Sequence, residues 1–236
     1  MSETSPPPAR LSTRDLFLIA AALITAVIFI TTSKEDNYRL HVISKPIPVL
    51  VMALWLGLLP RKGRYQWAVI AGLLLSAAGD LLISISDETF LFGLISFLLG
   101  HVAYIVAFLG DSRRLYLIRG LLAYAYGAAA YGTLYTAGDL GDMTVPVLAY
   151  VFVICTRLWR ASARVGEEDI PARSAWIGLA GAAFFTLSDT LLAFGLFAGQ
   201  RPLGPYAVML TYWIGQLGIT LSAAWQLPRS RLEQSF

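Results

Sequence analysis

The sequence predicts an all-α, polytopic membrane protein with about eight transmembrane helices. Of the 236 residues, 57% are hydrophobic and 14% are charged, whereas soluble domains carry about a quarter charged residues. The charges are gathered in short segments, and the stretches between them approach the ~20 apolar residues that a helix needs to cross a bilayer core. Apolar residues occupy every face of these stretches, which favours lipid-facing helices over amphipathic soluble ones.

Eight apolar stretches define the predicted spans, and together they form one transmembrane domain at residues 15–227. The first stretch follows Arg10 and Arg14, as a signal peptide would, but it is long for such a segment and "FITTSKED" offers no small-x-small cleavage site. We therefore predict a retained first helix, a disordered cytoplasmic tail at 1–14 and a cytoplasmic tail at 228–236. The spans lie near residues 15–32, 44–59, 65–85, 89–109, 115–135, 144–161, 174–198 and 205–227.

Lysine and arginine are distributed unevenly over the two predicted sides. Fourteen of the 18 basic residues fall on the side that holds both termini, among them Arg157, Arg160 and Arg164. Because cytoplasmic loops carry the excess of Lys and Arg, both termini are predicted to be cytoplasmic. The net charge of +3 reflects this topology and requires no nucleic-acid partner. The four basic residues on the opposite side are Lys34, Arg39, Lys45 and Arg201.

A tandem repeat divides the spans into two units of four. "GLLLSAAGDLL" in the third span resembles "GAAFFTLSDTLL" in the seventh, and in each a glycine stands eight residues before an aspartate. "IPVLVMALWL" in the second span resembles "VPVLAYVFVI" in the sixth, and "SFLLGH" in the fourth resembles "TYWIGQ" in the eighth. An even number of helices per unit makes the repeats parallel. We therefore predict two parallel four-helix repeats at about 15–110 and 115–227.

The repeats place one aspartate inside the third span, Asp80, and one inside the seventh, Asp189. Each lies 15 residues beyond the predicted start of its span, at Tyr65 and Ser174, which is roughly 22 Å from the cytoplasmic end. A two-fold axis along the membrane normal would let the two carboxyls face each other across one cavity. An ionised Asp in hydrocarbon costs ~2.5–3.5 kcal/mol on insertion scales, so both residues are candidates for function. The alternative is that each only hydrogen-bonds neighbouring helices.

Two buried carboxyls that share a site divide into one that holds its proton and one that ionises. One COOH donor and one carboxylate are what acid–base chemistry at neutral pH needs. A proton-coupled transporter can use the same pair. The pair alone therefore does not separate an enzyme from a transporter, and a non-catalytic scaffold would leave it unexplained.

Other candidate catalytic groups are few. His41 and His101 are the two histidines, and the chain has no HExxH, Walker or G-x-S-x-G motif, so no metal or cofactor is predicted. Cys155 is the single cysteine, which excludes an intrachain disulfide. His101, whose repeat counterpart is Gln216, is interpreted as an interhelical hydrogen-bonding residue. A group lining the cavity and a metal ligand are the alternatives.

Lys45 opens the second span in "SKPIPV", close to the depth of Asp80. Its ammonium could reach the headgroup layer or point into the cavity and hold a phosphate or carboxylate. In the second case it favours the ionised form of Asp80. Asp189, with no basic residue predicted nearby, then keeps the proton. This assigns the general acid to Asp189 and the base that guides water to Asp80.

Four segments carry a resemblance to a known family. "SKPIPVL", "AAGDLLI", "FLLGHVAY" and "FFTLSDTLLAF" resemble the YhhN-like family, the lysoplasmalogenases, and the eight-span plan is similar over nearly the whole chain. The resemblance implies hydrolysis of the vinyl ether bond of a lysoplasmalogen, giving a fatty aldehyde and glycerophosphoethanolamine or glycerophosphocholine. It implies a lysophospholipid substrate drawn from the bilayer, and a location in the bacterial inner membrane.

The chemistry of a vinyl ether agrees with this implication. Protonation of the β-carbon creates an oxocarbenium ion that water captures, and glycosidases handle such an ion with two carboxylates. We predict Asp80 and Asp189 as catalytic residues. The alternative is a proton-coupled transporter of a small amphiphile that uses the same two aspartates. The predicted substrate-binding residues are Lys45, His101, Tyr104 and Gln216.

Overall fold

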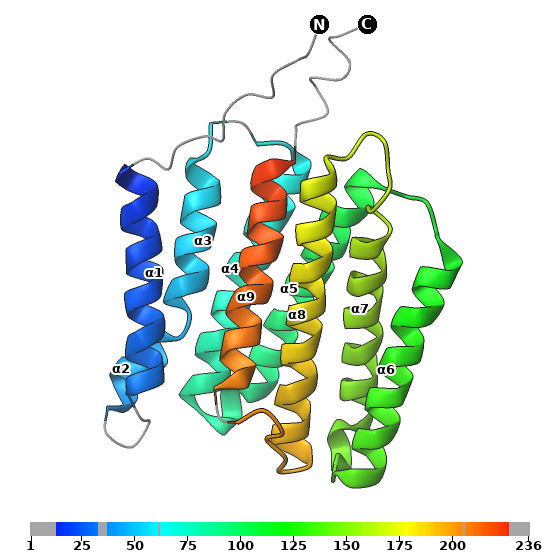
Figure 1. Cartoon of the computed structure of the whole chain (residues 1–236). Coiled ribbons are helices and arrows are strands. Elements are labelled where there is room, and N and C mark those ends of the chain that lie inside the picture. The colour runs from blue at the N-terminus through cyan, green and yellow to red at the C-terminus, as the bar shows by residue number, and fades with distance from the viewer. Residues whose placement is uncertain (1–12, 33–36, 61, 205, 227–236) are drawn as a thin grey trace, which may run out of the picture.

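The computed structural model describes residues 13–32, 37–60, 62–204 and 206–226, and in these ranges every regular element is helical. The predicted tail at 228–236 and residues 1–12 of the other tail lie outside the described residues. Figure 1 shows the long helices standing side by side as a bundle. The elements are α1 (Thr13–Thr31), α2 (Tyr38–Ser44), α3 (Ile47–Leu58), α4 (Arg64–Ile85), α5 (Asp87–Asp111), α6 (Leu117–Ala137), η1 (Gly141–Met143), α7 (Thr144–Ser162), α8 (Ala172–Phe197) and α9 (Ala207–Trp225).

The helices confirm the all-α, polytopic membrane class. Six segments are long and apolar enough to cross a bilayer. Two of them are joined pairs, α2–α3 and η1–α7, and the other four are α4, α5, α8 and α9. The apolar part of α1 is shorter, and α6 is not among the six, because its four tyrosines and three glycines dilute its aliphatic content. Since α6 lies along α7, the bundle keeps the predicted eight-helix plan. α1 begins and α9 ends at the same end of the bundle (Figure 1), as an even number of crossings requires.

The second predicted span begins earlier than expected and is broken. Instead of one helix at 44–59, α2 covers Tyr38–Ser44 and α3 covers Ile47–Leu58. Pro46 and Pro48 cause the break, because neither has a backbone N–H to continue the helical hydrogen bonds. Lys45 therefore sits between two helical pieces and not on the side of a continuous one.

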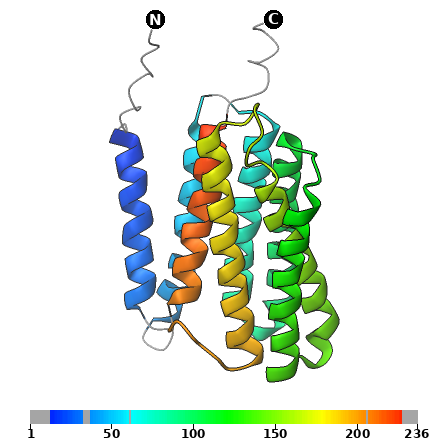
Figure 2. The ribbon, with the colours of Figure 1, turned by 45° about the vertical axis from the view of Figure 1, so that its right-hand side comes forward.

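Helix neighbours follow the predicted repeat. Within the first four long helices α1 packs on α3, α3 on α4 and α4 on α5, and the second four repeat this order as α6 on α7, α7 on α8 and α8 on α9. Across the halves α3 packs on α9 and, equivalently, α7 on α5. The two sets of four helices therefore share this order of neighbours, although α4 also packs on α9 and α6 on α8 without an equivalent contact in the other set. Figure 2 shows α1 at the edge of this bundle.

Two glycine contacts show the same correspondence in atomic detail. A Cβ placed on Gly100 would lie 3.2 Å from the carbonyl oxygen of Gly72, and one placed on Gly215 would lie 2.9 Å from that of Gly181. Both pairs join the third and fourth helices of a unit, α4 with α5 and α8 with α9. Small residues let helix backbones approach closely where lipid provides no hydrophobic driving force.

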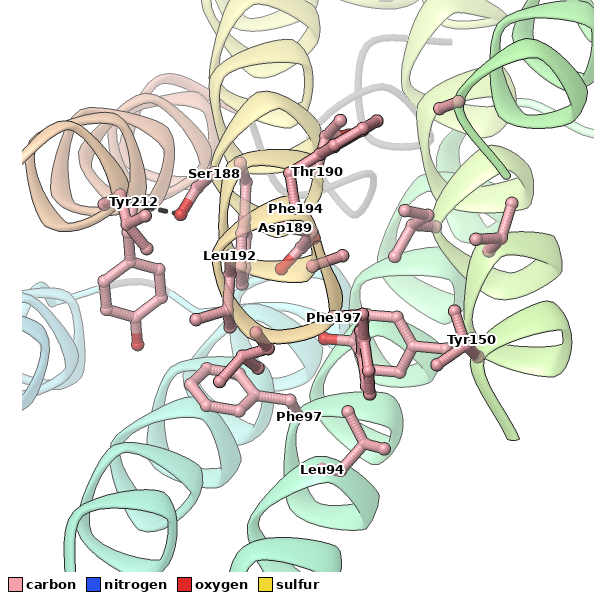
Figure 3. Close-up of a pocket in the computed structure, with 18 of the residues that line it drawn as sticks. Leu94, Phe97, Tyr150, Ser188, Asp189, Thr190, Leu192, Phe194, Phe197 and Tyr212 are labelled. Atoms are coloured by element: carbon pink, nitrogen blue, oxygen red, sulfur yellow. Dashed lines mark hydrogen bonds between the residues drawn. The ribbon is translucent and has the colours of Figure 1, made fainter. Parts of the chain in front are cut away.

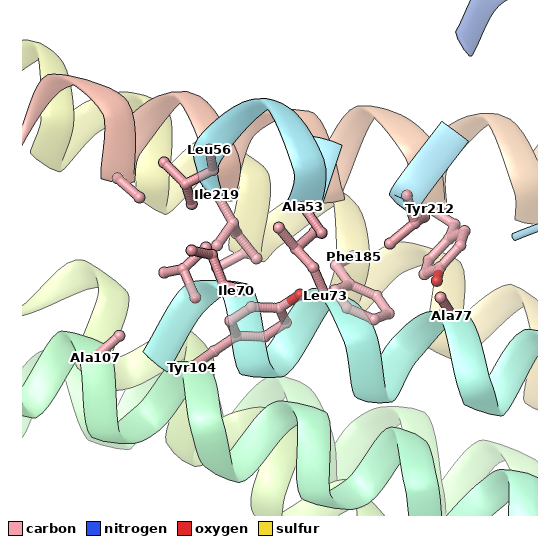
Figure 4. Packing of buried hydrophobic residues seen from close by; sticks show 14 of the residues in the cluster. Ala53, Leu56, Ile70, Leu73, Ala77, Tyr104, Ala107, Phe185, Tyr212 and Ile219 are labelled. Carbon is pink, nitrogen blue, oxygen red and sulfur yellow. The ribbon is translucent and has the colours of Figure 1, made fainter. Parts of the chain in front are cut away.

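The core lies where α3, α4, α5, α8 and α9 converge (Figure 4). Leu56, Leu73, Tyr104, Phe185 and Ile219, one from each of these helices, are at most 1% exposed and belong to one cluster. This core holds α4 and α8, the helices that carry the two aspartates, at fixed rotations. The helix faces that carry Asp80 and Asp189 therefore cannot turn toward lipid.

Arg157, Arg160 and Arg164, which count among the basic residues of the predicted cytoplasmic side, are all buried. Arg157 and Arg160 lie in α7, and Arg164 lies in the turn that follows it. Arg164 is 0% exposed, and its guanidinium lies 2.9 Å from the carboxylate of Asp111. Arg160 donates to the backbone carbonyls of Ser112 and Arg114. Buried cations must be paired or hydrogen-bonded in this way. If these three of the fourteen are left out, eleven basic residues on the side of the termini stand against four on the opposite side, so the direction of the asymmetry is unchanged.

Candidate active site

Asp80 and Asp189 line one pocket near the ends of α4 and α8. Their exposed fractions are 1% and 9%. The pocket contains about 1090 Å³ of unfilled space, its opening included, and Lys45 also lines it. Figure 3 shows Tyr150 and Tyr212, two further lining residues, on opposite sides of the α8 end that carries Asp189. The fold therefore brings the two repeat-related aspartates to a common space.

Asp80 is held by partners from two other parts of the chain. The Nζ atom of Lys45 lies 3.5 Å from Oδ1 of Asp80, and the lysine side chain is 15% exposed. Tyr212, from α9, donates a hydrogen bond to Oδ2 of Asp80 over 2.8 Å. Each carboxylate oxygen of Asp80 therefore has a partner that favours the ionised form. Lys45 contributes from the junction between α2 and α3.

Asp189 has a basic neighbour that the sequence did not predict. The Nη2 atom of Arg157, from α7, lies 3.7 Å from Oδ2 of Asp189, and this arginine is 0% exposed. The same oxygen accepts no hydrogen bond within the described residues. The assignment of the general acid to Asp189 rested on the expected absence of a cation, so Arg157 overturns that premise. Each aspartate has its own cation, and charge alone does not distinguish their roles.

His101 connects Arg157 to the pocket. Nη1 of Arg157 lies 2.9 Å from Nδ1 of His101, and because a guanidinium has only donors, Nδ1 must accept this bond. The imidazole proton is therefore assigned to Nε2, which lies 2.8 Å from the Tyr150 hydroxyl and 3.5 Å from Oδ2 of Asp189. His101 is thereby fixed as a neutral donor directed toward Tyr150 and Asp189.

Three of the four predicted substrate-binding residues lie behind the pocket wall. His101, Tyr104 and Gln216 are each 0% exposed and are absent from the pocket lining. Tyr104 donates to Oε1 of Gln216 over 2.6 Å, which joins α5 to α9. These contacts give Tyr104 and Gln216 a role in fixing the helices. Lys45 is the member of the set that reaches the pocket.

The sequence interpretation missed Arg157, Tyr150 and Tyr212. A signal for Arg157 was present, because it lies inside the predicted span at 144–161, where an ionisable residue is a functional candidate by default. Tyr150 and Tyr212 gave no comparable signal, since tyrosines are common in spans. As for metal ligands, the part of the chain that the structure describes has no place where three or more His, Cys, Asp or Glu side chains gather.

The fold and the pocket define a polytopic membrane protein with a buried two-carboxylate site, in which each carboxylate has its own cation. The chain belongs to the YhhN family, whose family model matches residues 40–223. This range contains Lys45, both aspartates and Arg157.

Several similar proteins carry names that describe an activity. The chain is 36% identical over 180 residues to human lysoplasmalogenase TMEM86B, covering 76% of this chain and 73% of that protein. It is 33% identical over 183 residues to human lysoplasmalogenase TMEM86A, covering 73% and 74%. It is 32% identical over 162 residues to a lysoplasmalogenase of Mycobacterium bovis, covering 64% and 56%. No solved structure matches the chain.

Proposed function

We propose that this protein is a lysoplasmalogenase that hydrolyses the vinyl ether bond and releases a fatty aldehyde and a glycerophospho-base. Membership of the YhhN family and the names of its human and mycobacterial relatives support the enzyme class. The observation that carries the chemical proposal is the pair of buried aspartates in one pocket, each beside a cation.

The reaction needs one proton donor and one base. The protonated aspartate adds its proton to the β-carbon of the vinyl ether, and positive charge develops on the oxygen-bearing α-carbon. The ionised aspartate removes a proton from a water molecule that attacks this carbon, giving a hemiacetal. Collapse of the hemiacetal breaks the bond to the glycerol oxygen, which takes up a proton, and yields the aldehyde. One water is consumed, and the two aspartates end with one proton between them, as at the start.

The charges around the pocket suit a phosphate-bearing substrate. Lys45 and Arg157 contribute two positive charges, and a pair of aspartates that shares one proton contributes one negative charge. The site then carries a net charge of +1, which complements the anionic phosphate. Lys45 is partly exposed at the pocket, so it is the cation proposed to hold that phosphate. The acid and base roles are proposed for the pair and not for one member.

The proposed setting is the inner membrane of a bacterium, with both termini in the cytoplasm. The excess of basic residues on the side of the termini, even without the three buried arginines, supports this orientation. Asp80 and Asp189 then lie in the outer half of the bilayer, because both are nearer to the ends of α4 and α8 than to their starts. A single-chain lipid would reach the pocket from the surrounding bilayer.

The deciding experiment uses purified protein in detergent with a lysoplasmalogen and measures the aldehyde formed. A saturated alkyl-ether lysophospholipid and an acyl lysophospholipid serve as controls, because neither contains the vinyl ether that the mechanism protonates. Aldehyde from the vinyl ether substrate alone is expected. If no aldehyde forms at any pH, the alternative of a proton-coupled transporter is favoured. A transporter cannot produce aldehyde in this assay, because it does not cleave its substrate.

A further inference from the structure

The pocket is longer than the two aspartates require. Asp80, Lys45 and Tyr212 belong to the side formed by α4, α9 and the α2–α3 break, and all three line it. On the other side of Asp189 the lining continues between α6, α7 and α8, and among the described residues no charged one contributes to it there. We call this second part the tail arm. Its walls include Gly127, Ala130, Leu134, Val147, Ile154 and Phe194.

The polar groups of the tail arm are already engaged. The Tyr131 hydroxyl donates to the backbone carbonyl of Thr144 over 3.1 Å. The Tyr126 and Thr190 hydroxyls lie 2.9 Å apart and join α6 to α8. With these groups paired, the arm offers an apolar surface that favours a hydrocarbon over water.

The order of groups along the pocket matches the order of groups in a lysoplasmalogen. Lys45 lies toward one end of the pocket, the tail arm forms the other end, and the two aspartates lie between them. The tail arm is lined in part by α6, which packs on α7 and α8 but not on α4 or α9. In the lipid, the phosphate, the vinyl ether and the alkenyl chain follow one another in the same order. A phosphate at Lys45 would therefore place the vinyl ether beside the aspartates and the chain in the tail arm.

Close packing of α6 on α7 limits the arm at Gly127. A Cβ on Gly127 would collide with the sulfur of Cys155 and would lie 3.1 Å from Cγ1 of Val151. The two helices therefore touch at this level. Ala130, three residues further along α6, lines the arm and has a methyl group as its whole side chain.

We propose that the tail arm binds the alkenyl chain of the substrate and that the small side chain of Ala130 sets the longest chain accepted. This inference rests on the proposed function, because it extends the same site. A larger side chain at residue 130 fills part of the arm and excludes the end of a long chain, while a short chain is unaffected. Each methylene kept out of an apolar site costs about fourfold in affinity, from ~0.8 kcal/mol of lost burial.

The test compares Ala130→Phe and the smaller Ala130→Leu with Ala129→Phe. Ala129 is exposed on the same helix and does not line the pocket, so it is the matched control. The kcat/KM is measured for lysoplasmalogens with decenyl, tetradecenyl and octadecenyl chains. If two methylenes are displaced, Ala130→Phe should lower kcat/KM for the octadecenyl substrate about fifteenfold. Both Ala130 variants should keep kcat/KM for the decenyl substrate within about twofold of the wild-type value. Ala129→Phe should leave kcat/KM unchanged for the decenyl and the octadecenyl substrate.

A binding measurement separates this inference from the proposed function. Saturated alkyl-ether lysophospholipids of the same chain lengths are not hydrolysed, and their binding is read from the rise in the apparent unfolding temperature. If the wild type makes no aldehyde but Ala130→Phe selectively loses long-chain binding, the tail arm stands and the hydrolase proposal fails. If hydrolysis occurs and Ala130→Phe affects all chain lengths equally, the chain does not lie in the tail arm.

Discussion

Arg157 and His101 are joined by a buried hydrogen bond of 2.9 Å between Nη1 and Nδ1. This contact fixes the imidazole as a neutral donor, because its acceptor nitrogen is occupied by a group that can only donate. The second terminal nitrogen of the guanidinium, Nη2, lies 3.7 Å from the carboxylate of Asp189. Arg157 thus acts on Asp189 directly by its charge and indirectly through His101.

Replacing Arg157 should expose the cost of leaving Asp189 without its cation. Arg157→Met removes the charge but keeps an unbranched apolar side chain, and loss of one partner of a buried ion pair costs ~3–5 kcal/mol. We expect a large fall in the apparent unfolding temperature of the purified protein in detergent. Adding Asp189→Asn to Arg157→Met should recover more than half of that fall, because the unpaired charge is gone. A double variant as unstable as the single one would show that Arg157 stabilises through its other contacts.

Each aspartate should be indispensable for hydrolysis. Asp80→Asn and Asp189→Asn keep the size of the side chain but remove the ability to exchange a proton, which typically costs ~10²–10⁴-fold in rate. The double variant should be no slower than the worse single variant, since the two groups act as one unit. Aldehyde release measures the rate. Asp142→Asn, at an exposed position outside the pocket, is the control. A single variant that keeps more than about a tenth of the rate would rule out the two-carboxylate mechanism.

Lys45 should matter most for substrates that carry a phosphate. A hydrogen bond to a charged group is worth ~1.5–3 kcal/mol, so Lys45→Met should raise KM for a lysoplasmalogen by about tenfold or more. A headgroup-free alkenyl glycerol should show a smaller rise. The kcat for both substrates should fall, because Asp80 loses the ammonium group that lies 3.5 Å from its carboxylate. The measurement is the ratio of the two KM values.

Arg201→Met is the control for Lys45→Met, because Arg201 is exposed in the loop between α8 and α9. An equal KM rise for both substrates would remove the phosphate role from Lys45. A variant with wild-type kinetics would show that the lysine has no part in turnover.

Tyr212 should act through Asp80. Tyr212→Phe removes the 2.8 Å hydrogen bond to Oδ2 of Asp80 with almost no change of volume. We expect kcat to fall by about tenfold or more, since the bond involves a charged acceptor. In an Asp80→Asn background the same change should have little further effect. Tyr124→Phe, which loses a hydrogen bond to the Thr156 hydroxyl and does not line the pocket, is the matched control. Equal losses in both backgrounds would mean that Tyr212 does not work through Asp80.

Packing of α8 on α9 should depend on Gly181. A Cβ at this position would lie 2.6 Å from the backbone nitrogen of Ile219 and 2.7 Å from the carbonyl oxygen of Gly215, and neither atom can rotate away. Gly181→Ala should therefore destabilise the protein by ~1–3 kcal/mol, the usual cost of overpacking. A Cβ at Gly132 in α6 meets no atom of the described residues within 4 Å, so Gly132→Ala should be neutral or slightly stabilising. Apparent unfolding temperatures test both, and equal values for the two variants would contradict the close contact.

The sequence by itself determined the class of the protein and the identity of its most informative residues. Uncharged stretches of ~20 residues cross a bilayer as helices, because a helix hydrogen-bonds its backbone groups within the same segment. A carboxylate within such a stretch is costly enough to be noticed, so Asp80 and Asp189 were found from composition and repeat alone. Depth along a helix follows from a fixed rise per residue. The position of Lys45 relative to Asp80 was therefore predictable.

Only the tertiary structure decided which side chains surround the aspartates. Lipid-facing helices are apolar on every face, so the sequence carries no amphipathic signal for which face turns inward. Arg157 was counted with the charges of the cytoplasmic side, and Tyr104 and Gln216 were expected at the substrate. These expectations failed because the rotation of each helix is set by its neighbours. The contacts of Arg157 with Asp189 and of Tyr212 with Asp80 join residues 32 and 132 positions apart. Such pairs exist only once the helices have packed, since packing alone fixes how each helix is turned about its own axis.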